Sequence, residues 1–139
     1  MLLAKLEELQ RRTRERPLDF YIPLPHGKAF HADPSKERWL IGANGSGKTV
    51  IGAAEVCSLV GGKATWWDGP PGEVWCGAVS LADSEKVQRP AIRAMLRPDL
   101  IAAWPNEHNP NAPSTLTLKN GWVIRFMATR QGREAWQGG

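Results

Sequence analysis

The chain has 139 residues, of which 42% are hydrophobic and 23% are charged, and its formal net charge is +4 at pH 7. This composition fits one globular domain and excludes collagen-like, low-complexity and wholly disordered chains. No apolar run approaches the roughly 20 residues that a membrane span needs. Charged residues also interrupt positions 1–9, where a secretory signal would be apolar. We therefore expect a cytoplasmic protein that has no membrane partner.

The cysteines and the charge give only weak indications of function. Cys57 and Cys76 form no CxxC motif, and the histidines show no metal-ligand spacing, so we predict buried thiols and neither a zinc site nor a disulfide. The positive charge would suit a polyanionic partner, although a solvated surface explains it equally well. The bias is clearest after Pro113, at Lys119, Arg125, Arg130 and Arg133.

The N-terminal region is predicted to be one helix followed by a connector. Leucines at 2, 3, 6 and 9 fall on one helical face, and Glu7 pairs with Arg11 at i,i+4, which predicts a helix over residues 2–16 that Pro17 ends. Residues 17–36 are rich in proline and lack periodicity, which indicates an extended connector. We assign residues 1–36 to this helix and connector, and residues 37–139 to the domain proper.

The domain is predicted to begin with two short buried strands separated by a helix. The apolar triplet Trp39–Ile41 enters a glycine-rich loop, and a helix is predicted over residues 50–60. Residues 64–73 form a glycine-proline loop, and the uninterrupted apolar run 74–79 predicts the second strand.

The remaining elements end in a hairpin. A helix is predicted from Asp83 or Ser84 to about Leu96, bent by Pro90, and one or two helical turns follow over 99–104 before a proline-asparagine loop. Strands over 115–119 and 122–127 are joined by Asn120-Gly121, a dipeptide that favours a type I′ turn.

One motif in the sequence directly predicts a binding function. Residues 42–49 fit G-x-x-x-x-G-K-[ST], the phosphate-binding loop, between an apolar triplet and a helical pattern. The glycines let backbone N–H groups wrap a phosphate, Lys48 is expected to reach the β and γ phosphates, and Thr49 is expected to bind Mg²⁺. The predicted ATP and Mg²⁺ site comprises Gly42, Ala43, Asn44, Gly45, Ser46, Gly47, Lys48 and Thr49.

The acid that hydrolysis needs is missing from this sequence. ATPases of this class hold Mg²⁺ and activate water with carboxylates at the end of a hydrophobic strand. Asp68 and Glu73 lie in the glycine-proline loop, and Asp83 and Glu85 start a helix. We therefore expect either a fragment that ends before the acidic strand, the interpretation we favour, or a protein that binds nucleotide without cleaving it.

Several motifs follow one another between about Pro25 and Gly139. They are Ala29-Phe30-His31, Gly42–Thr49 with Ile51–Glu55, Trp66–Gly69, Ser80–Asp83 with Val87-Gln88, and Gln131–Glu134 with Trp136–Gly138. In this order they resemble the ATPase domain of the large terminase subunit of tailed bacteriophages. Gly27 stands where members often carry a glutamine thought to read adenine. The family's acidic motif and nuclease domain have no counterpart here, so DNA cleavage is not assigned.

The resemblance implies a fold, a function and partners. It implies an α/β fold of the P-loop NTPase (ASCE) type, a three-layer sandwich that is incomplete here and has a β-hairpin near its C-terminus. It implies the ATP-binding part of a viral DNA-packaging motor, a hydrolase in the full-length protein and inactive as this chain alone. The implied partners are double-stranded DNA, further copies in a ring, the portal protein and the small terminase subunit, all in the cytoplasm of the host cell.

Arg133 is a second candidate catalytic residue beside Lys48. In terminases, an arginine at this place is thought to act as a finger that reaches the ATP of the neighbouring subunit, where a guanidinium stabilises the transferring phosphoryl group. A surface arginine paired with Glu134 is the alternative, and Arg130 competes for the role of finger.

Two other functional classes stay open. Gln88 follows Lys48 by 40 positions and Tyr21 precedes it by 27, offsets that loosely resemble ABC-type ATPases. A non-hydrolytic, nucleotide-dependent interaction module is the other possibility. The seven tryptophans could stack on nucleic-acid bases, but we predict core packing because Trp39, Trp75 and Trp122 fall in predicted strands. No histidine is assigned a catalytic role.

Overall fold

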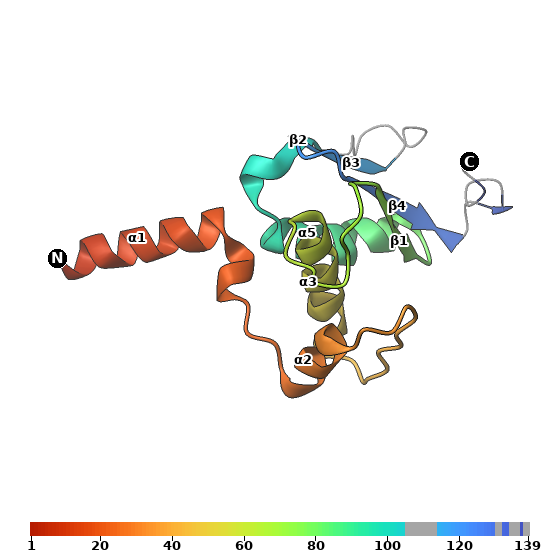
Figure 1. Ribbon diagram of the computed structural model, residues 1–139, viewed down its shortest axis with the longest axis horizontal. Coiled ribbons are helices and arrows are strands. Elements are labelled where there is room, and N and C mark those ends of the chain that lie inside the picture. The colour runs from red at the N-terminus through yellow and green to blue at the C-terminus, as the bar shows by residue number, and fades with distance from the viewer. Residues whose placement is uncertain (105–113, 130–131, 134–136, 138–139) are drawn as a thin grey trace. The chain divides into compact units, whose positions relative to one another are not determined.

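A computed structural model describes residues 1–104, 114–129, 132, 133 and 137 of the chain (Figure 1). These residues form a mixed α/β fold with a four-stranded sheet, which confirms the predicted α/β class. The chain divides into two compact units, residues 1–68 with 91–98, and residues 69–90 with the described residues from 99 onward. We describe each unit by itself. Within the described residues, no helix is both long and apolar enough to cross a membrane.

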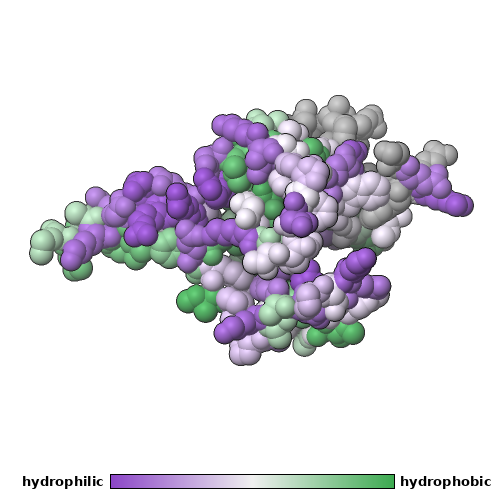
Figure 2. Space-filling model, viewed as in Figure 1, coloured by the Kyte–Doolittle hydropathy of each residue, from purple (hydrophilic) through white to green (hydrophobic). Residues whose placement is uncertain are grey.

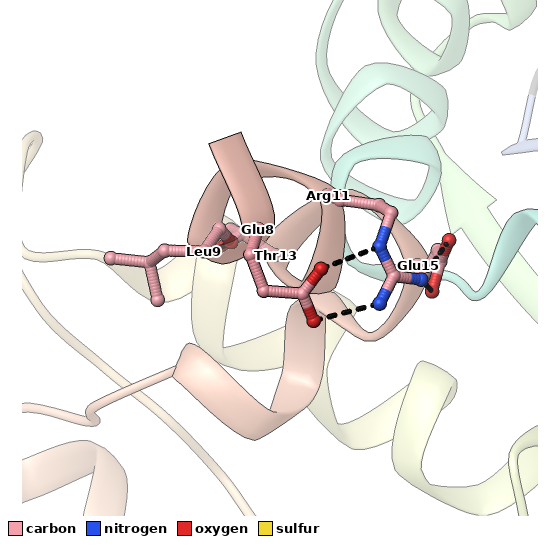
Figure 3. Close-up of polar contacts among 5 residues, drawn as sticks. All are labelled: Glu8, Leu9, Arg11, Thr13 and Glu15. Carbon is pink, nitrogen blue, oxygen red and sulfur yellow. Dashed lines mark hydrogen bonds and ion pairs between the residues drawn. The ribbon is translucent and has the colours of Figure 1, made fainter. Parts of the chain in front are cut away.

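The first unit begins with helix α1, Leu2–Glu15, which confirms the predicted N-terminal helix. Pro17 begins the short 3-10 helix η1, Pro17–Phe20. Figure 3 shows the Arg11 guanidinium between two carboxylates, 2.7 Å from Glu8 and 2.8 Å from Glu15. The leucines line the opposite edge of α1, which is green in Figure 2, and α1 buries none of its residues.

Helix α2, Pro25–Ala32, contradicts the predicted extended connector. Proline at the first helical position costs nothing, because the N–H that it lacks would have no partner inside the helix. Gly27 is the buried residue of α2, and a Cβ at Gly27 would lie 3.0 Å from the Ile51 side chain. This glycine therefore permits the close approach of α2 to the next helix.

Helix α3, Lys48–Val60, confirms the helix predicted after the glycine-rich loop. It supplies most of the core of the first unit, and the C-terminal half of helix α5, Arg89–Met95, belongs to the same unit. The Cys57 thiol is buried, as predicted, and contacts the Ile92 carbonyl oxygen at 3.5 Å. The buried apolar residues here are Ile51, Ala53, Ala54, Cys57, Val60, Ile92 and Leu96.

The strand predicted over Trp39–Ile41 is wrong, because residues 33–47 form neither helix nor strand. Trp39 is 79% exposed and Ile41 is 90% exposed. A strand needs a neighbour that pairs its backbone N–H and C=O groups, and no strand in the described part of the chain pairs with this segment. The prediction that the tryptophans pack in the core is also wrong for Trp39, Trp66, Trp67 and Trp75, which are exposed, whereas Trp122 is buried.

The second unit holds the sheet, with strand order β1-β4-β3-β2. The strands are β1 Glu73–Ala78, β2 Ile101–Ala103, β3 Thr115–Leu118 and β4 Val123–Ala128. Strand β1 confirms the predicted second strand, and it pairs in parallel with β4, while β3 pairs antiparallel with both β2 and β4. Cys76 on β1 is only partly buried, and this burial raises the pKa of its thiol to about 11.

Between β1 and β2 the chain is helical, as predicted, except at its end. Ser80 rather than Asp83 or Ser84 caps the start, since the Ser80 hydroxyl oxygen accepts from the Asp83 N–H at 3.1 Å. The helices are α4 Leu81–Asp83, the π-helical turn η2 Ser84–Gln88, α5, and the 3-10 turn η3 Pro98–Leu100. The wide η2 turn precedes Pro90, which cannot donate an intrahelical bond. Residues 101–103 form β2 instead of continuing a helix, and the predicted loop from 105 to 113 lies outside the described residues.

The predicted hairpin of β3 and β4 is confirmed, but its turn is not type I′. Of the described residues, only glycines have positive φ, so Asn120 does not adopt the conformation that type I′ requires. Instead, Lys119–Gly121 form a three-residue loop, closed by the bond from the Leu118 N–H to the Trp122 carbonyl, with φ of 95° at Gly121. Gly121 is therefore the residue that the turn depends on.

Two glycine-to-alanine variants test this account of the backbone. We expect Gly121→Ala to lower the free energy of unfolding by about 1–2 kcal/mol, because a Cβ is strained at this φ and would lie 3.3 Å from Pro71. Gly52→Ala is the matched control. Gly52 lies inside α3 with open space around its Cα, so alanine is expected to stabilise by about 0.5–1 kcal/mol. Urea unfolding measures both, and equal midpoints would contradict the account.

Candidate nucleotide-binding site

The glycine-rich loop of residues 42–47 leads directly into α3. Gly45 has φ of 78° and Gly47 has φ of 81°, both in the left-handed region that side chains disfavour. A Cβ at Gly42 would lie 2.6 Å from the Ser46 hydroxyl oxygen. Positions 45 and 47 therefore favour glycine through their backbone conformation, whereas at Gly42 a side chain would displace the Ser46 hydroxyl.

Lys48 is the first residue of α3, and its side chain folds back over the loop. The ammonium donates to the Gly42 carbonyl at 2.5 Å and to the Ala43 carbonyl at 2.6 Å. A phosphate oxygen is a stronger acceptor for an ammonium than a neutral carbonyl is. The Lys48 ammonium is thus already held at the loop, on carbonyl oxygens that a phosphate can replace.

The residues present also fit Mg-ATP in their chemistry. The start of a helix of 13 residues supplies backbone N–H groups and the positive end of its dipole. Thr49 is exposed at the second position of α3, and its hydroxyl is an oxygen ligand of the kind that Mg²⁺ takes. Asn44 and Gly45 at the tip of the loop are exposed as well, so the tip is open to a ligand.

Helix α2 contacts this loop through a residue that the sequence analysis left without a role. His26 Nε2 lies 2.8 Å from the Ser46 carbonyl oxygen. A carbonyl can only accept, so Nε2 carries the proton. The loop is therefore bonded to a second element, in addition to the bonds that it makes to Lys48.

A polar cluster holds α2, α3 and the segment between them together. The Glu55 carboxylate on α3 contacts His31 Nδ1 on α2 and the Arg38 guanidinium, each at 2.5 Å. All three side chains are less than a quarter exposed. Arg38 also donates to the Phe30 carbonyl at 3.0 Å and lies over the Phe30 and Trp66 rings. The carboxylate thus joins two basic side chains that come from different segments.

Tyr21 extends the cluster toward η1. Its hydroxyl lies 3.1 Å from His31 Nε2, and the two rings meet edge to face. Because Nδ1 of His31 donates to Glu55, neutral His31 accepts the Tyr21 hydroxyl proton at Nε2. Burial, and then the negative charge of Glu55, raise the pKa of Tyr21 above its ordinary value. The phenol is therefore held in its neutral form.

The sequence carried one signal for this cluster. Beyond the first turn of α3, Glu55 is the only charged residue and Ser58 is the one other polar side chain. A carboxylate on a helix that buries its neighbours needs a cationic partner. That reasoning predicts a partner for Glu55, but it could not have chosen His31 and Arg38 from the chain's other basic residues.

The other predicted functional residues belong to the second unit. Arg133 is exposed, whereas Arg130, Gln131 and Glu134 lie outside the described residues. The Gln88 side-chain amide donates to the Gly77 carbonyl at 2.6 Å. Glu73 stands at the start of β1, where the side chains of Arg125 and Trp75 donate to its carboxylate and lower its pKa. Lys48 and Arg133 thus come from different units.

The single tyrosine of the chain lets the polar cluster be tested directly. We expect Tyr21 to ionise above pH 10, and Glu55→Gln to lower its pKa, because the variant removes a negative charge near the phenolate. The raised pKa also means that stability is lost as pH rises past 10, since the unfolded chain then releases the proton first. Difference absorbance of the phenolate follows the titration. A Tyr21 pKa at or below 10, or one unchanged in Glu55→Gln, would contradict the geometry.

Comparison with protein-family models, with curated proteins and with solved structures finds no match to this chain. The assignment of a function therefore rests on the site itself and on the sequence motifs.

Proposed function

We propose that residues 42–49 bind the phosphates of Mg-ATP. One observation carries this proposal: a loop with glycines at positive φ runs directly into Lys48, the first residue of α3, whose ammonium already rests on the loop's own carbonyls. Backbone N–H groups at the start of α3 would meet the phosphate oxygens, and a bound phosphate would draw the ammonium from the carbonyls of Gly42 and Ala43.

Thr49 is the residue that would hold the metal ion. Thr49 is an exposed residue that follows Lys48 at the start of the helix. A bound Mg²⁺ would bridge phosphate oxygens and neutralise part of their charge. Lys48 and Thr49 would then act on the same phosphate group, one as a donor and the other through the metal ion.

We further propose that the chain is the ATP-binding part of a DNA-packaging motor of the large-terminase kind, with a fold of the P-loop NTPase type. The support is the order of the sequence motifs, from Phe30-His31 through the phosphate loop to Arg133. Such a motor would act on double-stranded DNA as a ring of copies, docked on a portal and loaded by a small subunit. Arg133 would reach the ATP of the neighbouring copy.

Lys48→Ala tests the phosphate site. We expect the wild-type chain to bind Mg-ATP weakly, and the variant to bind at least about 10-fold more weakly, because a charge-assisted bond contributes about 1.5–3 kcal/mol. Titration calorimetry measures both affinities, and Lys36→Ala is the matched control because it removes a lysine in the segment before the loop. Thr49→Val should weaken binding only when Mg²⁺ is present. Unchanged affinity in Lys48→Ala would contradict the site.

Arg133→Ala tests the motor in the full-length protein. We expect ATP turnover to fall by about 10³- to 10⁵-fold with little change in ATP affinity, because an arginine finger acts on charge that develops in the transition state. Mixing Arg133→Ala with Lys48→Ala protein should restore part of the activity, since some interfaces then join an intact loop to an intact arginine. Normal turnover in Arg133→Ala would refute the finger and make Arg130 the residue to test.

A further inference from the structure

We infer that His26 is a positioning residue of the phosphate loop, which orients the Gly47 N–H toward bound phosphate by holding the Ser46 carbonyl. The inference rests on the proposed nucleotide-binding function and names a residue that the motif does not contain. Its central observation is the 2.8 Å contact between His26 Nε2 and the Ser46 carbonyl oxygen.

The rigidity of the peptide group gives this contact its effect. The Ser46 carbonyl and the Gly47 N–H belong to one trans peptide, so the two groups point in opposite directions. Fixing the carbonyl on His26 therefore fixes the Gly47 N–H on the other side of the same plane. Gly47 precedes α3 as its N-cap, which places this N–H among the donors at the helix start.

The loop needs a hydrogen bond that fixes this peptide group, because its glycines do not restrict the backbone. Gly45 and Gly47 flank Ser46, and glycine restricts the backbone less than any other residue. The Ser46 peptide could therefore rotate at little energetic cost. A hydrogen bond to its carbonyl removes that freedom before the ligand arrives, which reduces the entropy lost on binding.

Helix α2 is fixed against α3 by contacts of its own, so the position of His26 is well defined. Gly27, the next residue, packs closely against Ile51 of α3, since a Cβ there would lie 3.0 Å from the Ile51 side chain. At the other end of α2, His31 contacts Glu55, which also lies on α3. Two separate contacts thus fix α2 against α3, and His26 projects from this braced helix to the loop.

The contact also differs in kind from the bonds of Lys48. Lys48 holds the Gly42 and Ala43 carbonyls with the group that would have to move to a phosphate. His26 lies outside the loop and donates to the Ser46 carbonyl within it. This hydrogen bond can therefore persist when nucleotide is bound. Nε2 donates in the neutral tautomer that is protonated on Nε2 and in the imidazolium alike, so the hydrogen bond does not require a change in the charge of the ring.

Two substitutions at His26 separate the hydrogen bond from the shape of the ring. His26→Phe keeps a ring but has no donor, and we expect it to weaken Mg-ATP and Mg-ADP binding about 3- to 10-fold, as the loss of one neutral hydrogen bond implies. His26→Gln has no ring, but its amide carries a donor at a similar reach, and it should bind within about twofold of wild type. Titration calorimetry of the full chain gives the affinities, and circular dichroism checks that the variants fold.

The tautomer of His26 gives a readout that does not depend on nucleotide. In the ¹⁵N spectrum of the histidine side chains without ligand, we expect His26 to carry its proton on Nε2, and the Gly47 amide signal to shift in His26→Phe but much less in His26→Gln. A neutral His26 protonated on Nδ1 would overturn the inference, because that ring could not donate to Ser46.

The outcomes distinguish this inference from the proposed function. If the wild-type chain binds Mg-ATP and His26→Phe binds it equally well, the inference is wrong and the phosphate site stands. If His26→Gln binds as weakly as His26→Phe, a hydrogen-bond donor at this position does not restore binding, and the inference is also wrong. If the wild-type chain does not bind Mg-ATP, the proposed function fails and the role of His26 fails with it.

Discussion

The Glu55 carboxylate is the contact on which the first unit of the chain depends. It draws His31 from α2 and Arg38 from the following segment to one point on α3, each at 2.5 Å. A largely buried ion pair adds little net stability to a fold. Removing one partner, however, strongly destabilises the fold, because the other charge stays buried without compensation. The cluster therefore specifies which surfaces of α2 and α3 meet. That choice in turn sets His26 beside the phosphate loop, where it contacts Ser46.

The parts of the fold that could be predicted are those whose signals lie within a few residues. The leucine spacing and the i,i+4 pairs specify α1, the glycine-rich motif specifies the start of α3, and Asn120-Gly121 specifies the hairpin. Trp39–Ile41 fails because an apolar triplet becomes a strand only if another strand pairs with it. Helix α2 was missed because residues 17–36 are rich in proline and lack periodicity, although Pro25 stands at the first helical position, where proline is favourable.

In the candidate site, too, the features with local sequence signals could be predicted and those that join distant residues could not. The loop and Lys48 could be located from sequence because every fixed residue of the motif has its task within eight positions. The contacts of His26 and His31 could not, because they join residues 20 and 24 positions apart. Gly27 is instructive. Sequence reasoning noted only the missing glutamine, whereas the structure gives a packing reason, since any Cβ there would press on Ile51.

The most direct test of the phosphate site is the response of the backbone amides to ligand. In ¹H–¹⁵N spectra of the wild-type chain titrated with Mg-ATP, the account predicts the largest shifts at Gly45, Gly47, Lys48 and Thr49, where N–H groups would meet phosphate. Adenosine, which lacks phosphates, should leave these amides nearly unchanged. The account would be contradicted if Mg-ATP left the loop amides unmoved, or shifted chiefly residues of α1 or of the β3–β4 hairpin.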